Sequence, residues 1–93
     1  IDLRTLIPLD KNTVLESIKK TNRAIVLHEA NLTGGIGAEI VSIISEKAFE
    51  YLDAPITRVA SLDTPIPFGE KIESNVYLPL KRLEEKIIKL LKY

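Results

Sequence analysis

The sequence predicts an α/β fold, a mostly parallel sheet with helices packed on its faces. Short apolar runs of strand length alternate with longer segments in which apolar residues recur every three or four positions. A glycine-rich turn at residues 34–37 joins one such run to the helical pattern that follows. Alternation of this kind places successive strands parallel, with right-handed crossovers through the helices.

The first half of the chain predicts two strands and the helix between them. Residues 1–4 alternate apolar and charged side chains, which indicates a strand ending near Thr5. Asp10 is then suited to cap a helix, because the apolar residues after it share one helical face: Val14, Leu15 and Ile18. A continuous apolar run over residues 24–27 predicts a strand that is buried on both faces.

The second half predicts a helix over residues 36–52, a strand over 56–60 and a final helix that starts at Pro79. Between the last two elements, Pro65 and Pro67 predict an extended stretch that runs into a polar loop ending near Asn75. Three strands are few for a sheet covered on both faces. We therefore expect an incomplete sheet whose open edges pair with something else.

Composition restricts the classes of function. The 93 residues suffice for one domain, and the formal net charge of +0 argues against binding to nucleic acid or to an acidic membrane. Without cysteine, a disulfide framework, a thiolate metal site and a cysteine nucleophile are excluded. The chain opens without methionine on what looks like a strand already under way. Residues 1–93 are therefore expected to be a single domain, truncated at its N-terminus.

Three glycines, Gly34, Gly35 and Gly37, precede the second predicted helix. One explanation is an anion site, because amides at a helix N-terminus attract phosphate or carboxylate groups. The other is a tight turn with positive φ, or close packing that leaves no room for a side chain. The segment has neither the Lys-Ser/Thr pair of a phosphate-binding loop nor a dinucleotide fingerprint. The structural explanation therefore receives more weight.

His28 and Glu29 are the candidates for chemistry. His28 is the only histidine, and it stands at the carboxyl end of the middle strand, where open α/β sheets bind ligands. Successive strand residues point to opposite faces, so His28 and Glu29 would not meet as an acid/base pair while the strand continues. We expect His28 to be a hydrogen-bonded interface or loop-anchoring residue. No metal-ligand spacing or serine-nucleophile motif is present, and Asp63-Thr64 before Pro65 is typical of a turn.

Six segments carry motifs that, taken in order, closely resemble one known family: residues 1–10, 26–30, 34–40, 52–55, 58–59 and 63–68. The resemblance covers essentially the whole chain. It is to the carboxyl-terminal, transketolase-type domain of the β subunit of thiamine-dependent 2-oxoacid dehydrogenases, a family that includes the pyruvate, branched-chain and acetoin dehydrogenase components.

The resemblance implies a three-layer α/β/α domain with a five-stranded sheet in an enzyme of two α and two β subunits. In such enzymes thiamine diphosphate and magnesium lie between other domains, and this domain holds no cofactor ligand. It supports contacts with the α subunit and the second β subunit, and the end of the β subunit helps to dock the lipoyl acyltransferase core. Lys92 and Tyr93 match the position of that docking end. The expected compartment is the cytoplasm, or the mitochondrial matrix in a eukaryote.

The departure from the family is at the front, where members have two further strands and a helix. One of the absent strands would lie between residues 1–4 and residues 24–27, so we predict either dimerisation through a sheet edge or a rearranged strand order. The expected function is that of a non-catalytic assembly domain. The alternative is a freestanding module that binds an anion at Gly34–Gly37. Which 2-oxoacid the parent enzyme uses stays open.

Overall fold

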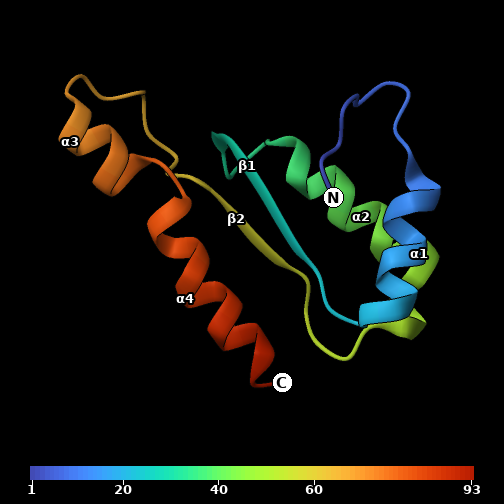
Figure 1. The fold of residues 1–93 in the computed structure, drawn as a ribbon. Helices are drawn as coiled ribbons and strands as arrows, with labels where there is room; N and C mark the ends of the chain where they lie inside the picture. Colours follow the sequence, from blue (N-terminus) through green and yellow to red (C-terminus); the bar gives the residue numbers. More distant parts are fainter.

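The structure alternates helices and strands, as the sequence predicts (Figure 1). It is a computed structural model that describes the backbone of residues 1–93 and every side chain except those of Asn75 and Val76. The α/β fold is confirmed. The elements in order are α1 (Lys11–Thr21), β1 (Ile25–Asn31), α2 (Ile36–Ala48), the 3-10 turn η1 (Phe49–Tyr51), β2 (Thr57–Ser61), the short helix α3 (Glu70–Ile72), the π-helical turn η2 (Glu73–Tyr77) and α4 (Leu80–Leu91).

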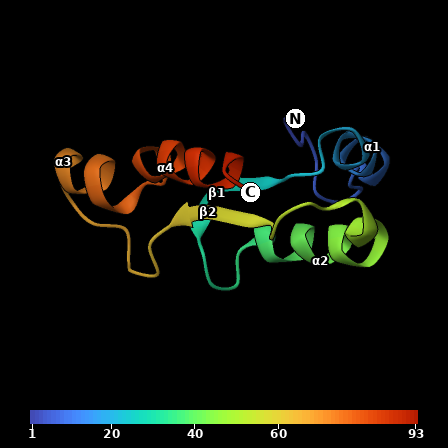
Figure 2. The ribbon, with the colours of Figure 1, turned by 90° about the horizontal axis from the view of Figure 1, so that it is seen from below.

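The two strands run parallel and adjacent, with Ile25 opposite Thr57 and Leu27 opposite Val59. The register is irregular between Leu27 and Asn31, where β1 approaches the glycine turn. Helix α4 lies on one side of the sheet and α2 on the other, so the sheet is the middle layer (Figure 2). Within the described chain the sheet has these two strands, and each therefore has one edge without a neighbouring strand.

The core is built where α1 and α2 pack together beside β1. Ile40, Ile44 and Ala48 recur at four-residue spacing on α2, and all three are buried, with Ile44 only 1% exposed. They meet Val14 and Ile18 of α1. Burial of each such isoleucine contributes about 1.5 to 3 kcal/mol, so this cluster is the main source of stability on that side of the molecule.

The ends of α1 are fixed by polar side chains. The Oδ1 atom of Asp10 accepts a hydrogen bond from the amide of Thr13 at 3.1 Å, which confirms the predicted N-cap. At the other end Asn22 adopts the left-handed conformation, with φ of 62°. Its side chain donates to the carbonyl of Tyr51 at 2.7 Å, which joins the end of α1 to η1, the turn that follows α2.

Two expectations from the sequence are wrong. Residues 1–4 form no strand. Ile1, Asp2 and Leu3 line a groove together with β1, and in the described chain no strand lies between them and β1 to pair with either. The polar loop expected up to Asn75 is instead the pair α3 and η2. Gly69, with φ of 103°, turns the chain, and its carbonyl accepts the first helical hydrogen bond from the amide of Glu73 at 3.0 Å.

Candidate functional site

The candidate residues lie where β1 and β2 end, at the edge of the sheet where parallel α/β folds bind ligands. Two loops meet here, one between β1 and α2 and the other between β2 and α3. The amide of Leu32 donates to the carbonyl of Ser61 at 3.1 Å, so the two loops leave the sheet side by side. The predicted residues His28, Gly34, Gly35 and Gly37 all belong to the first of these loops and its flanks.

The imidazole of His28 packs against the start of α2. A methyl group at Gly37 would stand 2.6 Å from His28 Nε2, and one at Gly35 would stand 2.5 Å from His28 Cε1. A Cβ atom essentially never comes this close to a non-bonded atom, so a side chain at either position requires the His28 ring to move. His28 Nδ1 lies 3.1 Å from the carbonyl oxygen of Ala30, and Nε2 is buried without a hydrogen-bond partner.

The three glycines therefore have different causes. Gly34 has φ of +75° and open space around the position of a Cβ, so its conformation demands glycine. Gly35 has φ of −76°, which any residue adopts, and it is confined by the Asn31 carbonyl as well as by His28. The sequence expectation of positive φ at the turn holds for Gly34 alone among the three, and close packing explains the other two.

Glu29 lies on an exposed part of β1. Because β1 continues to Asn31, His28 and Glu29 are successive strand residues on opposite faces, and the structure does not bring them together. Among the described residues, no group of three or more histidine and acidic side chains is arranged to hold a metal ion.

Asp63 links the two loops. Its carboxylate accepts hydrogen bonds from the amide and the hydroxyl of Thr33, the amide at 2.9 Å. The bond from the hydroxyl, followed by the bond from the amide, holds the pKa of Asp63 below the ordinary aspartate value. The sequence expectation of turn chemistry at this position identifies the residue but not its partner, which lies 30 positions earlier in the chain.

Further contacts here were not anticipated from the sequence. Tyr77 donates its hydroxyl proton to Asn31 Oδ1 at 2.7 Å, and Arg58 donates from Nη1 to the carbonyl of Leu32 at 3.0 Å. Arg82 of α4 donates to the carbonyl of Ala60 at 2.7 Å. The sequence offers one signal for these contacts. Arg58 stands inside a short apolar strand, and a charged side chain there needs a hydrogen-bond partner.

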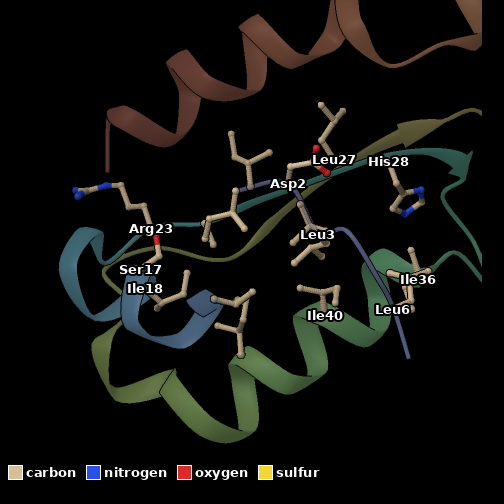
Figure 3. Close-up of a pocket in the computed structure, with 16 residues that line it drawn as sticks. Asp2, Leu3, Leu6, Ser17, Ile18, Arg23, Leu27, His28, Ile36 and Ile40 are labelled. Carbon is tan, nitrogen blue, oxygen red and sulfur yellow. The ribbon is translucent and has the colours of Figure 1, made fainter. Parts of the chain in front are cut away.

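A groove of 440 Å³ follows β1 on the side away from β2. The N-terminal segment forms one wall, and β1 forms the other with apolar side chains of α1 and α2 (Figure 3). The labelled residues Leu3, Ile18 and Ile40 all line it. The groove thus holds the unpaired edge of β1 and an apolar lining, which suits an extended segment of polypeptide.

The C-terminal residues lie apart from the loop site. Arg23 donates from Nη2 to the main-chain oxygen of Tyr93 at 2.5 Å, and its Nη1 lies 4.0 Å from Asp53 Oδ2. The side chains of Lys92 and Tyr93 are exposed, Tyr93 by 61%. The backbone of this end is therefore fixed against the turn that precedes β1, while both side chains remain accessible.

Comparisons with known proteins agree with this arrangement. A family model described as "Transketolase, C-terminal domain" matches residues 1–82. The chain is 51% identical over 73 residues to a protein of Rickettsia felis named pyruvate dehydrogenase E1 component subunit beta, covering 78% of this chain and 22% of that protein. It is 49% identical over 81 residues to a mitochondrial 2-oxoisovalerate dehydrogenase subunit beta 2 of Arabidopsis thaliana, covering 87% and 22%.

A relative from Cyanidium caldarium, also named pyruvate dehydrogenase E1 component subunit beta, matches all 93 residues at 38% identity and is covered over 28% of its own length. The chain thus spans between a fifth and a third of the length of these relatives. None of the helices in the described chain combines the length and the apolar composition that crossing a bilayer requires.

Proposed function

Because the chain belongs to the transketolase C-terminal domain family, we propose that it is an assembly domain of the β subunit of a 2-oxoacid dehydrogenase. The proposed parent reaction is the thiamine-dependent oxidative decarboxylation of pyruvate or a branched-chain 2-oxoacid, with acyl transfer to a lipoyl group. In this proposal the chain contributes subunit contacts, and the reacting groups belong to other parts of the enzyme.

The observation that carries the proposal is the apolar surface that the fold leaves uncovered. Phe68 is 100% exposed and Ile7 96%, and Phe49 and Ile66 are each exposed by at least 70%. Ile66 and Phe68 are two positions apart before α3, and exposed apolar side chains that lie together in this way are typical of surfaces that contact another protein. The groove along β1 adds an unpaired strand edge, which a further segment of the same subunit would complete.

We propose that this chain supplies no ligand to thiamine diphosphate or magnesium. Magnesium prefers oxygen ligands from acidic side chains, and the described residues contain no cluster that could supply them. The start of α2 would be the natural site for the diphosphate, but the ring of His28 lies against Gly35 and Gly37 there. We propose that other domains of the parent enzyme hold the cofactor, and this packing also disfavours an anion-binding module at Gly34–Gly37.

The proposed partners are the α subunit, the second β subunit and the lipoyl acyltransferase core. The exposed side chains of Lys92 and Tyr93 stand on a backbone that Arg23 fixes in place, so the end of the chain is available for docking. This part of the proposal rests on the position of these residues and on the family resemblance.

The test compares the isolated chain with the whole subunit. The isolated chain should release no carbon dioxide from pyruvate or 3-methyl-2-oxobutanoate in the presence of thiamine diphosphate and magnesium. In the whole subunit, Phe68→Asp should reduce assembly with the α subunit, measured by analytical ultracentrifugation. Lys20→Asp, a change at an exposed polar position, is the matched control and should leave assembly intact. Turnover by the isolated chain, or full assembly and activity of the Phe68→Asp subunit, contradicts the proposal.

A further inference from the structure

A second cavity, of 250 Å³, lies between the carboxyl end of β2 and helix α4. It shares no lining residue with the groove along β1, and Gly34, Gly35 and Gly37 do not line it, although Leu32 of the same loop does. Arg58 enters it from β2, and Arg82 and Lys86 enter it from α4; all three are partly buried. Asp63, whose carboxylate accepts two hydrogen bonds from Thr33 and also interacts with the charge of Arg58, is the acidic residue of the lining, against three cations. The cavity therefore carries an excess of positive charge.

Arg58 and Lys86 retain unused hydrogen-bond donors. A guanidinium group has five N–H donors, and Arg58 uses one for the Leu32 carbonyl. Lys86 has no hydrogen bond or ion pair with any side chain that the structure describes. Arg82 directs Nη2 to the carbonyls of Ala60 and Tyr77 and thereby fixes its own position beside the strand.

Ser61 supplies an independent observation. Its side chain is 0% exposed, its Oγ has no hydrogen-bond partner, and the residue lines this same cavity. A buried hydroxyl without a partner costs free energy, so a bound group that offered Oγ a hydrogen-bond partner would stabilise this end of β2.

We propose that this cavity binds a phosphate-type oxyanion, either inorganic phosphate or the phosphate group of a small phosphomonoester. The oxygens of one phosphate group could accept hydrogen bonds from the guanidinium of Arg58, the ammonium of Lys86 and the hydroxyl of Ser61 at the same time. The anion would also compensate the clustered positive charge, which is costly when partly buried. This site is independent of the proposed role in assembly.

The experiment is a titration of the ¹⁵N-labelled chain with inorganic phosphate, followed by amide chemical shifts at constant ionic strength. Saturable shifts should centre on Ser61, Leu62 and the α4 turn that contains Lys86. Lys86→Gln should weaken binding about tenfold and Ser61→Ala about three- to tenfold. Neither side chain makes a described hydrogen bond, so both variants should fold. Lys81→Gln, an exposed position of the same helix outside the lining, should leave the affinity unchanged.

A second titration with glycerol phosphate identifies the source of the anion. Tighter binding than that of inorganic phosphate indicates a phosphomonoester, and equal binding indicates free phosphate. Shifts that do not saturate, or equal effects of Lys81→Gln and Lys86→Gln, would overturn the proposal, because both indicate charge screening without a site. Saturable shifts centred on residues 35–38 would overturn it too, since the anion would then bind at the start of α2.

Discussion

The contact between His28 and the start of α2 predicts that Gly37→Ala destabilises the domain only while His28 is present. The added methyl group would stand 2.6 Å from Nε2 and 2.7 Å from Cδ2 of the ring. Forcing such overlap costs about 1 to 3 kcal/mol, whereas alanine in place of glycine in a helix contributes at most about 1 kcal/mol. The net loss should therefore be about 1 to 2 kcal/mol in the free energy of unfolding, measured by urea denaturation and circular dichroism.

The His28→Ala background tests the cause. With the ring gone, Gly37→Ala should become neutral or stabilising, which corresponds to a coupling free energy of about 2 kcal/mol in the double-mutant cycle. Gly35→Ala should stay destabilising in the same background, because its methyl group also meets the Asn31 carbonyl at 2.5 Å. Gly34→Ala is the matched control; its cost comes from φ of +75° and should not depend on residue 28. Equal losses for Gly37→Ala with and without His28 would refute this reasoning.

Other predictions concern the carboxylates and the core. Because hydrogen bonds lower the pKa of Asp63 in the folded state, its stabilising effect is present above the unfolded aspartate pKa of about 3.9 and is lost as the pH falls through the lower folded value. Asp63→Asn should therefore flatten the fall of Tm between about pH 4 and pH 2; an unchanged slope contradicts the role of Thr33 as donor. Asp10→Ala should lower the urea midpoint while Asp10→Asn largely preserves it, since either amide or carboxylate oxygen caps α1, and equal effects would exclude capping. Ile44→Ala should cost about 2 to 5 kcal/mol by urea denaturation, and Ile88→Ala, at a half-exposed site, well under half as much; similar losses at both would place the core elsewhere.

The sequence predicts the fold well where the signals are local. Helical spacing of apolar residues identifies α1, α2 and α4, and the N-cap at Asp10 is found because its partner Thr13 lies three positions away. The strand expected at residues 1–4 fails for the opposite reason. An alternating pattern indicates that one face of the segment is apolar. A strand also requires a neighbouring strand to hydrogen-bond with its backbone, and in the described chain none is adjacent to residues 1–4.

The loop site shows the same division. Because Gly34, Gly35 and Gly37 are close together in the sequence, they suggest one shared role. The structure shows two roles: Gly34 is required for its positive φ, whereas Gly35 and Gly37 leave room for the ring of His28. The links from Asp63 to Thr33 and from Tyr77 to Asn31 join residues 30 and 46 positions apart. Propensity and periodicity act over a few residues, so they cannot predict which distant polar groups meet.

The links between the two loops have a consequence for how this end of the molecule moves. The amide of Leu32 is bonded to Ser61 and the amide of Leu62 to Tyr77, while Asp63 holds Thr33. Opening either loop breaks bonds that also restrain the other, so the two should open in a single cooperative event. Their amide hydrogens should then exchange with deuterium at a common free energy of opening, so this end of the molecule should behave as one unit.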